Sequence, residues 1–273
     1  TPHQLVMTAT PIPRTLAMSA YGDLDTSIID ELPPGRTPIQ TVTIPLDRRE
    51  QVLQRIASNC REGKQAYWVC TLVEQSETLD AQAAEATYQE IKERFSDINT
   101  GLVHGKLKAD EKQSVMQAFK DNQLQLLIAT TVIEVGVDVP NASIMVIENA
   151  ERLGLSQLHQ LRGRVGRGAT ASFCALLYKT PLSQNGQERL SILRESNDGF
   201  VIAEKDLEIR GPGELLGTKQ TGDMGFRVAR LERDDHLLSQ AHYVAAQILK
   251  DYPQHADGLL KRWLPEAPRY AYV

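Results

Sequence analysis

Residues 124–142 read LQLLIATTVIEVGVDVPNA: an apolar run ends in two threonines and then passes through a glycine, an aspartate and a proline. A continuous apolar run is typical of a strand that is buried on both faces of a parallel sheet, and the polar residues after it indicate a functional loop. Ligands of open parallel sheets bind beyond the carboxyl ends of the strands, so we expect Thr130, Thr131 and Asp138 at that edge. In an alternative interpretation, Asp138 only caps the turn before the Val-Pro pair.

Strands and helices alternate on either side of this stretch. The sequence predicts strands at 39–45, 66–73, 98–104, 125–131, 143–149 and 172–179, and helices that follow Asp47-x-x-Glu50, span 79–95 and span 109–120. Such alternation requires right-handed crossovers and produces a parallel sheet with helices on both faces. After Thr180 the alternation stops, and helix-forming sequence at 184–196 and 202–209 predicts a mainly helical carboxyl-terminal region. The predicted fold class is therefore α/β.

The composition agrees with a globular chain of ordinary size. With 273 residues, of which 41% are hydrophobic, it can bury one core of domain size and a smaller appendage. No apolar stretch reaches the length of about 18 residues that a membrane span needs, and no signal segment is visible, so we expect no membrane partner. Cys60, Cys70 and Cys174 are odd in number and lack metal-ligand spacing. This favours buried thiols in a reducing cytoplasm and no structural metal.

Residues 160–167, QLRGRVGR, combine three arginines with two glycines. At about 3.6 residues per turn, Gln160, Arg164 and Arg167 would share one helix face, where like charges repel, and each glycine would cost a helix about 1 kcal/mol. Guanidinium groups bind phosphate oxygens in a bidentate manner, which indicates a polyanion as the ligand. The alternative is a solvated basic helix end. With Arg152 and Arg162, these arginines predict a local positive patch in a chain of net charge −5.

This segment resembles motif VI of superfamily 2 helicases and translocases, Gln-x-x-Gly-Arg-x-Gly-Arg. In that family the arginines reach across a cleft between two domains to the γ-phosphate of the nucleotide. The resemblance implies that Arg164 and Arg167 act as catalytic arginine fingers together with Gln160. An arginine finger can accelerate phosphoryl transfer by about 10³-fold or more.

Two further segments resemble motifs of the same superfamily. Residues 130–138 resemble motif V, which implies that Gly136 and Asp138 meet the nucleotide ribose and that Thr130 and Thr131 contact the nucleic-acid backbone. Thr8-Ala-Thr10, within MTATPIPR at 7–14, resembles motif III, which links the nucleotide site to the nucleic-acid site. The resemblance implies a RecA-like motor architecture.

A phosphate-binding loop is missing from this sequence. No Gly-x-x-x-x-Gly-Lys-Ser/Thr occurs, because Gly63-Lys64 is followed by Gln65 and Gly105-Lys106 by Leu107. The acid pair Asp110-Glu111 suits the first turn of a helix better than a magnesium site. We therefore expect ATP and Mg²⁺ to be bound mainly by a first motor domain that is absent here, and the chain alone to be inactive.

Residues 196–222 contain a helix-breaking Arg210-Gly-Pro-Gly213 and a loop that ends in Gly-Thr-Lys-Gln-Thr-Gly. Composition alone would make this an ordinary glycine-rich connector. The whole chain, however, resembles the carboxyl-terminal part of the RecG family of bacterial ATP-dependent DNA helicases, and the loop resembles its translocation motif. This implies a motor that moves along double-stranded DNA and remodels stalled forks and Holliday junctions, with a wedge domain absent here. Arg210 and Gln220 are then candidates for coupling ATP hydrolysis to DNA movement.

The resemblance also implies a division of the chain into three parts. Residues 1–37 would end the first motor domain and form a linker, 38–181 would form the second RecA-like motor domain, and 182–273 would form a helical hairpin, the translocation loop and a tail. The stretch 234–273 carries no recognisable motif. Two alternatives stay open: a translocase of the transcription-repair coupling type, and a non-catalytic DNA-binding or regulatory domain.

Overall fold

The computed structural model describes residues 37–71, 77–134, 139–168, 170–210 and 231–263, together with residues 5, 7, 27–29 and 31. The chain forms two compact units, one holding the described residues of 29–209 and the other those of 210–263. The division into functional parts at 37 and 181 stays a prediction.

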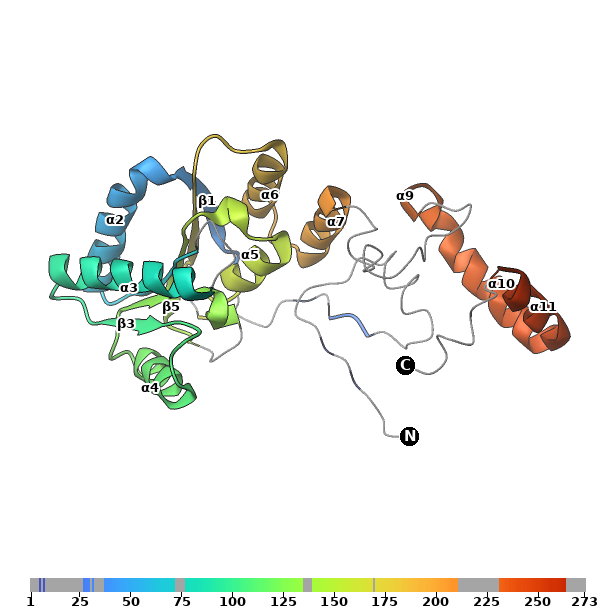
Figure 1. Ribbon diagram of the computed structural model, residues 1–273, viewed down its shortest axis with the longest axis horizontal. Coiled ribbons are helices and arrows are strands. Elements are labelled where there is room, and N and C mark those ends of the chain that lie inside the picture. Colours follow the sequence, from blue (N-terminus) through green and yellow to red (C-terminus); the bar gives the residue numbers. More distant parts are fainter. Residues whose placement is uncertain are drawn as a thin grey trace. The chain divides into compact units, whose positions relative to one another are not determined.

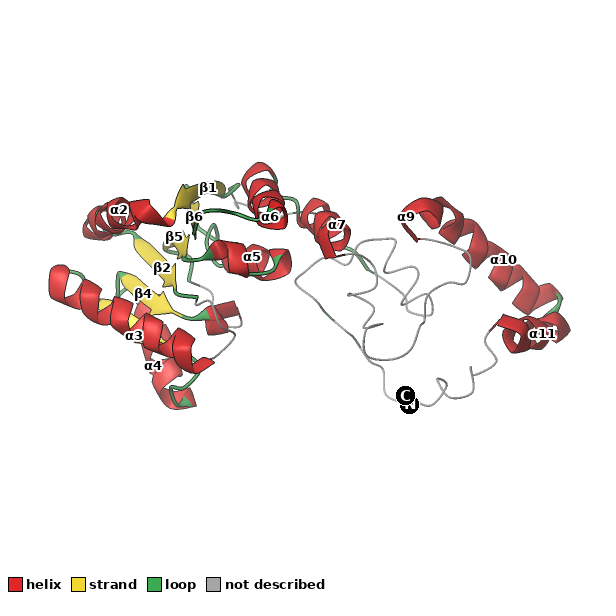
Figure 2. Ribbon diagram, turned by 45° about the horizontal axis from the view of Figure 1, so that its top comes forward, coloured by secondary structure: helices red, strands yellow, loops and turns green. Residues whose placement is uncertain are grey.

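The first unit is built around a parallel sheet of six strands, in the order β1-β6-β5-β2-β4-β3 (Figures 1 and 2). The strands are β1 (Gln40–Pro45), β2 (Gln65–Val69), β3 (Thr100–Val103), β4 (Leu126–Ala129), β5 (Ala142–Ile147) and β6 (Phe173–Tyr178). Every neighbouring pair is parallel, from Gln40 opposite Phe173 to Val103 opposite Ala129, and the register of β2 against β5 shifts between Gln65 and Ala66. The predicted α/β fold with a RecA-like sheet is confirmed.

Helices cover both faces of this sheet (Figure 1). One face is covered by α2 (Arg49–Arg61) and α3 (Glu77–Arg94), whereas the other is covered by α4 (Ala109–Lys120), α5 (Leu155–Arg162), α6 (Gln184–Glu195) and α7 (Gly199–Arg210). Short 3-10 helices lie at Leu46–Arg48, Thr131–Glu134 and Ala150–Arg152.

Adjacent strand residues point to opposite faces, and both faces are buried. In β2, Trp68 packs under α2 and α3, while Tyr67 packs on the other side against Phe119 of α4, with ring centroids 4.9 Å apart. Both β2 side chains are at most 1% exposed. Burial of each large apolar side chain contributes about 1.5–3 kcal/mol, which explains why these strands read as continuous apolar runs.

The second unit is helical in its described residues. It contains α9 (Leu231–Asp234), a 3-10 turn (Asp235–Leu237), α10 (Leu238–Asp251) and α11 (Pro253–Trp263), which confirms a mainly helical carboxyl-terminal region. Apolar side chains on these helices are open to solvent, among them Tyr243 and Leu249, each 65% exposed. None of the helices in the described ranges is long and apolar enough to cross a membrane.

Two sequence expectations about local structure are wrong. The strand expected at 66–73 ends at Val69, because the neighbouring strands β4 and β5 end opposite it and leave no ladder partner further on. The expected helix cap at Asp47 is absent: a 3-10 turn covers this residue, and α2 begins after Arg48 without a side-chain cap. The helix predicted at 109–120 has those bounds in the structure.

Candidate functional site

The arginine motif begins inside α5 and ends outside it. The helix stops at Arg162, and Gly163 caps it by donating its N–H to the carbonyl of His159 at 3.0 Å. Arg164 and Arg167 therefore lie beyond the helix, in what we call the arginine loop (Gly163–Gly168). The expectation that they share a helix face with Gln160 is wrong, because glycine ends the helix before these residues are reached.

Two glycines of the arginine loop, Gly166 and Gly168, are required by neighbouring protein atoms. Gly166 has a φ of +77°, and a Cβ there would lie 2.9 Å from Cγ1 of Ile39. A Cβ on Gly168 would lie 2.5 Å from the backbone oxygen of Pro140. Val165, directly before Gly166, is fully buried and anchors the loop in the core. The loop is thus held between the start of the sheet unit and the segment that leads into β5.

These contacts place the arginine loop at the amino edge of the sheet. All strands are parallel, so residues before a strand lie at the amino edge and residues after it lie at the carboxyl edge. The arginine loop precedes β6, and Pro140 precedes β5. Arg167 is exposed, and its Nε donates to the carbonyl of Gly163 at 3.1 Å, which leaves its guanidinium near the surface of this edge.

Thr130 and the residues next to Asp138 lie at opposite edges. Thr130 follows β4, is 4% exposed and donates its N–H to the carbonyl of Val103 at 3.2 Å, so its expected place at the carboxyl edge is confirmed. Thr131, half-buried, begins the next 3-10 helix. Val139, in contrast, accepts a hydrogen bond from the N–H of Ala142, where β5 begins. Val139 therefore lies at the amino edge, whereas Asp138, which was expected at the carboxyl edge, lies outside the described residues.

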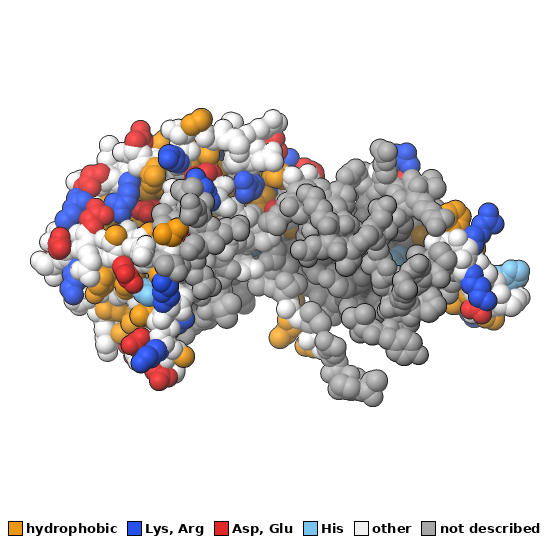
Figure 3. Space-filling model, viewed as in Figure 1, with side chains coloured by type: hydrophobic (Ala, Val, Ile, Leu, Met, Phe, Trp, Pro, Cys, Tyr) orange, Lys and Arg blue, Asp and Glu red, His pale blue; other side chains and the backbone are white. Residues whose placement is uncertain are grey.

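The sequence predicted a positive patch that includes Arg152 and Arg162, but the structure places both residues outside it. Arg162 is 2% exposed, and its Nη1 donates to the carbonyls of Leu193 at 2.7 Å and Ser196 at 2.8 Å. Arg152 precedes α5, at the opposite end of the helix from the arginine loop, and pairs with Glu151 at 3.7 Å. On the visible face of the sheet unit, acidic and basic side chains are interspersed (Figure 3). The positive charge of the motif is confined to its loop.

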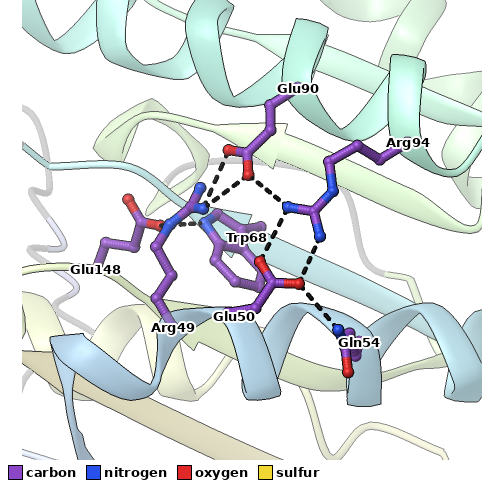
Figure 4. A network of polar contacts seen from close by, with 7 residues as sticks. All are labelled: Arg49, Glu50, Gln54, Trp68, Glu90, Arg94 and Glu148. Atoms are coloured by element: carbon purple, nitrogen blue, oxygen red, sulfur yellow. Dashed lines mark hydrogen bonds and ion pairs between the residues drawn. The ribbon is translucent and has the colours of Figure 1, made fainter.

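At the carboxyl edge, sequence analysis missed a polar network that joins four elements (Figure 4). Glu148, directly after β5, accepts hydrogen bonds from Nε1 of the buried Trp68 at 3.0 Å and from Nε of Arg49. Arg49 also pairs with Glu90 of α3 at 3.0 Å. Burial alone would lower the pKa of Arg49, but Glu148 and Glu90 outweigh it and raise that pKa. The sequence signal that could have indicated this network is an acidic residue, Glu148, directly after an apolar strand.

The same turn fixes the end of β2. The side-chain hydroxyl of Thr71 donates to the carbonyl of Glu148, and Nδ2 of Asn149 donates to the carbonyl of Thr71 at 2.7 Å. Asn149 adopts the left-handed conformation, with φ +49°, which asparagine tolerates better than most residues. At the carboxyl edge, the ends of β5 and β2 are therefore joined by polar contacts, and Thr71 is buried.

Two family models match this chain. The helicase conserved C-terminal domain matches residues 47–169, which include the sheet from β2 to β5 and the arginine loop. The carboxyl-terminal part of domain 3 of the ATP-dependent DNA helicase RecG matches residues 196–260, which include α7, α10 and most of α11. The chain belongs to the RecG family of helicases.

Relatives of known name support the same family. The chain is 66% identical over 271 residues to the RecG helicase of Escherichia coli strain K12 and 50% identical over 269 residues to that of Bacillus subtilis strain 168. These matches cover 99% and 95% of this chain, and 39% of each relative. A solved structure of RecG bound to a three-way DNA junction is 46% identical, with a TM-score of 0.67, over 84% of this chain and 30% of that one. The chain thus spans about two fifths of the length of its RecG relatives.

Several residues to which the helicase resemblance assigns a role lie outside the described part of the chain. Gln160 lies within α5 and Arg164 lies just after it, and both are half-buried. Arg210 is the last residue of α7. Within the described residues, no group of three or more His, Cys, Asp or Glu side chains could hold a metal ion. The following are not described: Thr8, Thr10, Gly136, Asp138, Gln220 and the side chain of Arg210.

Proposed function

We propose that this chain is the second motor domain and the coupling region of an ATP-driven helicase that translocates on double-stranded DNA and remodels forks and Holliday junctions. The observation that carries the proposal is the arginine loop, which presents Arg167 at the amino edge of a RecA-like sheet and is fixed there by Gly168 against Pro140. Membership of the RecG family supports the same activity.

The nucleotide would meet this chain at the amino edge. Arg164 and Arg167 would bind the γ-phosphate, and Gln160 would assist them. Gly136 and Asp138 would hold the ribose, because Pro140, two residues after Asp138, touches the arginine loop. The sequence holds no phosphate-binding loop, and the described residues hold no acid cluster for a metal. ATP, whose hydrolysis supplies the driving free energy, and Mg²⁺ would therefore be bound mainly by the first motor domain.

Double-stranded DNA would meet the opposite edge. Thr130 and Thr131 would contact its backbone, at the edge where Asn149 donates a hydrogen bond to the carbonyl of Thr71. Thr8 and Thr10 would link the two sites from the first motor domain. Residues 130–141 connect the carboxyl edge, where DNA would bind, to the amino edge, where the nucleotide would bind. A displacement of the chain at one edge would therefore displace it at the other.

Coupling to DNA movement would involve the region after α7. Arg210 ends this helix, and Gln220 lies ten residues further along the chain. A translocase of the transcription-repair coupling type would share the arginine motif. The family model that matches residues 196–260 is that of RecG, which favours branched DNA, such as forks and Holliday junctions, as the substrate. The wedge and the first motor domain would complete the motor.

The proposal is tested with a chimera in which this chain replaces the 271 matching residues of the Escherichia coli relative. We expect DNA-stimulated ATP hydrolysis and unwinding of a three-way junction by the chimera, and neither activity by this chain alone, because positioning of the phosphates dominates catalysis of phosphoryl transfer. A folded chimera without ATP hydrolysis would overturn the proposal. Hydrolysis by the purified chain alone would overturn the division of the site between two domains.

A further inference from the structure

Arg162 differs from the other arginines of its motif in being buried. It is the last residue of α5, is 2% exposed and precedes the arginine loop directly. Its guanidinium donates from Nη1 to the carbonyls of Leu193 at 2.7 Å and Ser196 at 2.8 Å. Leu193 belongs to the last turn of α6, and Ser196 caps that helix. Arg162 therefore fastens the end of α5 to the end of α6.

The bond that Arg162 makes to α6 suits a mechanical link. The last carbonyls of a helix have no partner within the helix and carry a partial negative charge, so a buried cation is stabilised there. A second contact, from Nη2 of Arg162 to Nδ1 of His159 at 3.1 Å, holds the guanidinium within its own helix. A buried charge is tolerated only where it is hydrogen-bonded, so this geometry resists sliding of α5 against α6.

A second polar contact ties the first turn of α5 to α7. The hydroxyl of Ser156 donates to Oδ2 of Asp206 at 3.1 Å, and Asp206 is only 5% exposed. Ile202 of the same helix is packed in the core with Leu158. The helices α5, α6 and α7 lie side by side on one side of the sheet (Figures 1 and 2). Both ends of α5 are thus bonded to the helical pair that leads to Arg210.

We infer that Arg162 is a positioning residue that transmits movement of the arginine loop to α6 and α7, and through α7 to the coupling region that begins at Arg210. The inference rests on the proposed function. Arg162 touches neither nucleotide nor DNA in this account. Packed, hydrogen-bonded elements move as units, so a displacement of the loop on nucleotide binding or release is passed to α6 through the two carbonyl contacts.

The test uses the chimera with Arg162→Met and with Arg162→Lys, and measures base pairs unwound per ATP hydrolysed on a three-way junction. For Arg162→Met we expect this ratio to fall by about fivefold or more, as is typical when coupling between two sites is lost. Lysine keeps a buried cation that can donate to these carbonyls but lacks the planar guanidinium that also reaches His159, so Arg162→Lys should restore part of the ratio. The matched control is Arg194→Met in the last turn of α6, where the Arg194 side chain is 52% exposed and pairs with the neighbouring Glu195.

A purely structural role would give a different result. It would lower ATP hydrolysis and unwinding in proportion and leave their ratio at the wild-type value, and that outcome would overturn the inference. Ratios are compared at a temperature where circular dichroism shows every variant folded. If Arg162→Met does not fold, the same ratio is measured for Arg162→Lys and Ser156→Ala. Wild-type ratios in both variants would overturn the inference. An unmodified chimera without DNA-stimulated hydrolysis would instead overturn the proposed function itself.

Discussion

The three arginines of residues 160–167 have different surroundings, although only a few positions separate them. Arg162 is 2% exposed and bonded to two helix-end carbonyls, whereas Arg167 is exposed at the amino edge of the sheet. An exposed guanidinium can bind a phosphate without first breaking buried hydrogen bonds, while removal of Arg162 from its site would leave buried carbonyls unsatisfied. The same residue type is thus exposed at one position, where it could bind a ligand, and packed in the core at another.

At Gly168, we predict that substitution by alanine destabilises the sheet unit. The new Cβ would lie 2.5 Å from the carbonyl oxygen of Pro140, which is backbone and cannot move aside cheaply. Overpacking of this kind costs about 1–3 kcal/mol in the free energy of unfolding. Urea unfolding followed by circular dichroism measures it. The control is Gly258→Ala in α11, where no atom lies within 4 Å; an equal loss in both variants would contradict this account.

For the three cysteines, we predict that none reacts with Ellman's reagent at pH 8 in the native protein. All are free and buried, and burial raises the pKa of Cys60 and of Cys174 to about 12. In the unfolded protein a cysteine thiol has a pKa of about 8.5, so above that pH the unfolded state ionises while the buried thiols stay protonated. The free energy of unfolding therefore has its full value below that pH and falls as the pH rises towards 12. Rapid native labelling would show that the core is not packed as described; denaturant should release all three thiols.

At the scale of the elements, one short helix and one connecting segment determine the geometry of the site. Helix α5 ends after eight residues at Gly163, which turns the chain into the arginine loop, and residues 130–141 cross from the carboxyl to the amino edge of the sheet. Strand alternation was predictable because apolar runs of β-forming residues are specific to buried strands. The edge crossing follows from the same alternation, because the chain that leaves one parallel strand at the carboxyl edge must return to the amino edge before the next strand begins. The burial of Arg162 was not predictable, because it depends on the end of α6, about thirty residues later in the chain.

For the region that begins where α7 ends, we predict that Arg210→Ala or Gln220→Ala in the chimera leaves DNA-stimulated ATP hydrolysis largely standing and sharply reduces fork unwinding. Neither residue belongs to a nucleotide-binding motif, and the glycines between them permit a hinge. Both rates are measured on one fork substrate. A proportional fall in the two would mean that the region serves the nucleotide site or stability, and the coupling role would be wrong.

On the scale of the whole molecule, we propose that the chain supplies one half of a phosphoryl-transfer site. Its sequence contains no phosphate-binding loop, and it spans 39% of the length of its RecG relatives. The arginine loop packs closely against Ile39 and Pro140, so its arginines would already be positioned when they meet a nucleotide that another domain holds. Preorganised charge of this kind accelerates phosphoryl transfer because no reorganisation is needed when the transition state forms.

The most direct measurement of this claim is the ATP turnover of the chimera with Arg164→Lys or Arg167→Lys, on saturating junction DNA. The planar, bidentate contact to the γ-phosphate is lost with lysine, so we predict a fall of about a thousandfold in turnover while junction affinity stays unchanged. Arg152→Lys, at the other end of α5, is the matched control and should turn over ATP as the unmodified chimera does. Near wild-type turnover in either lysine variant would contradict the arginine-finger role of that residue.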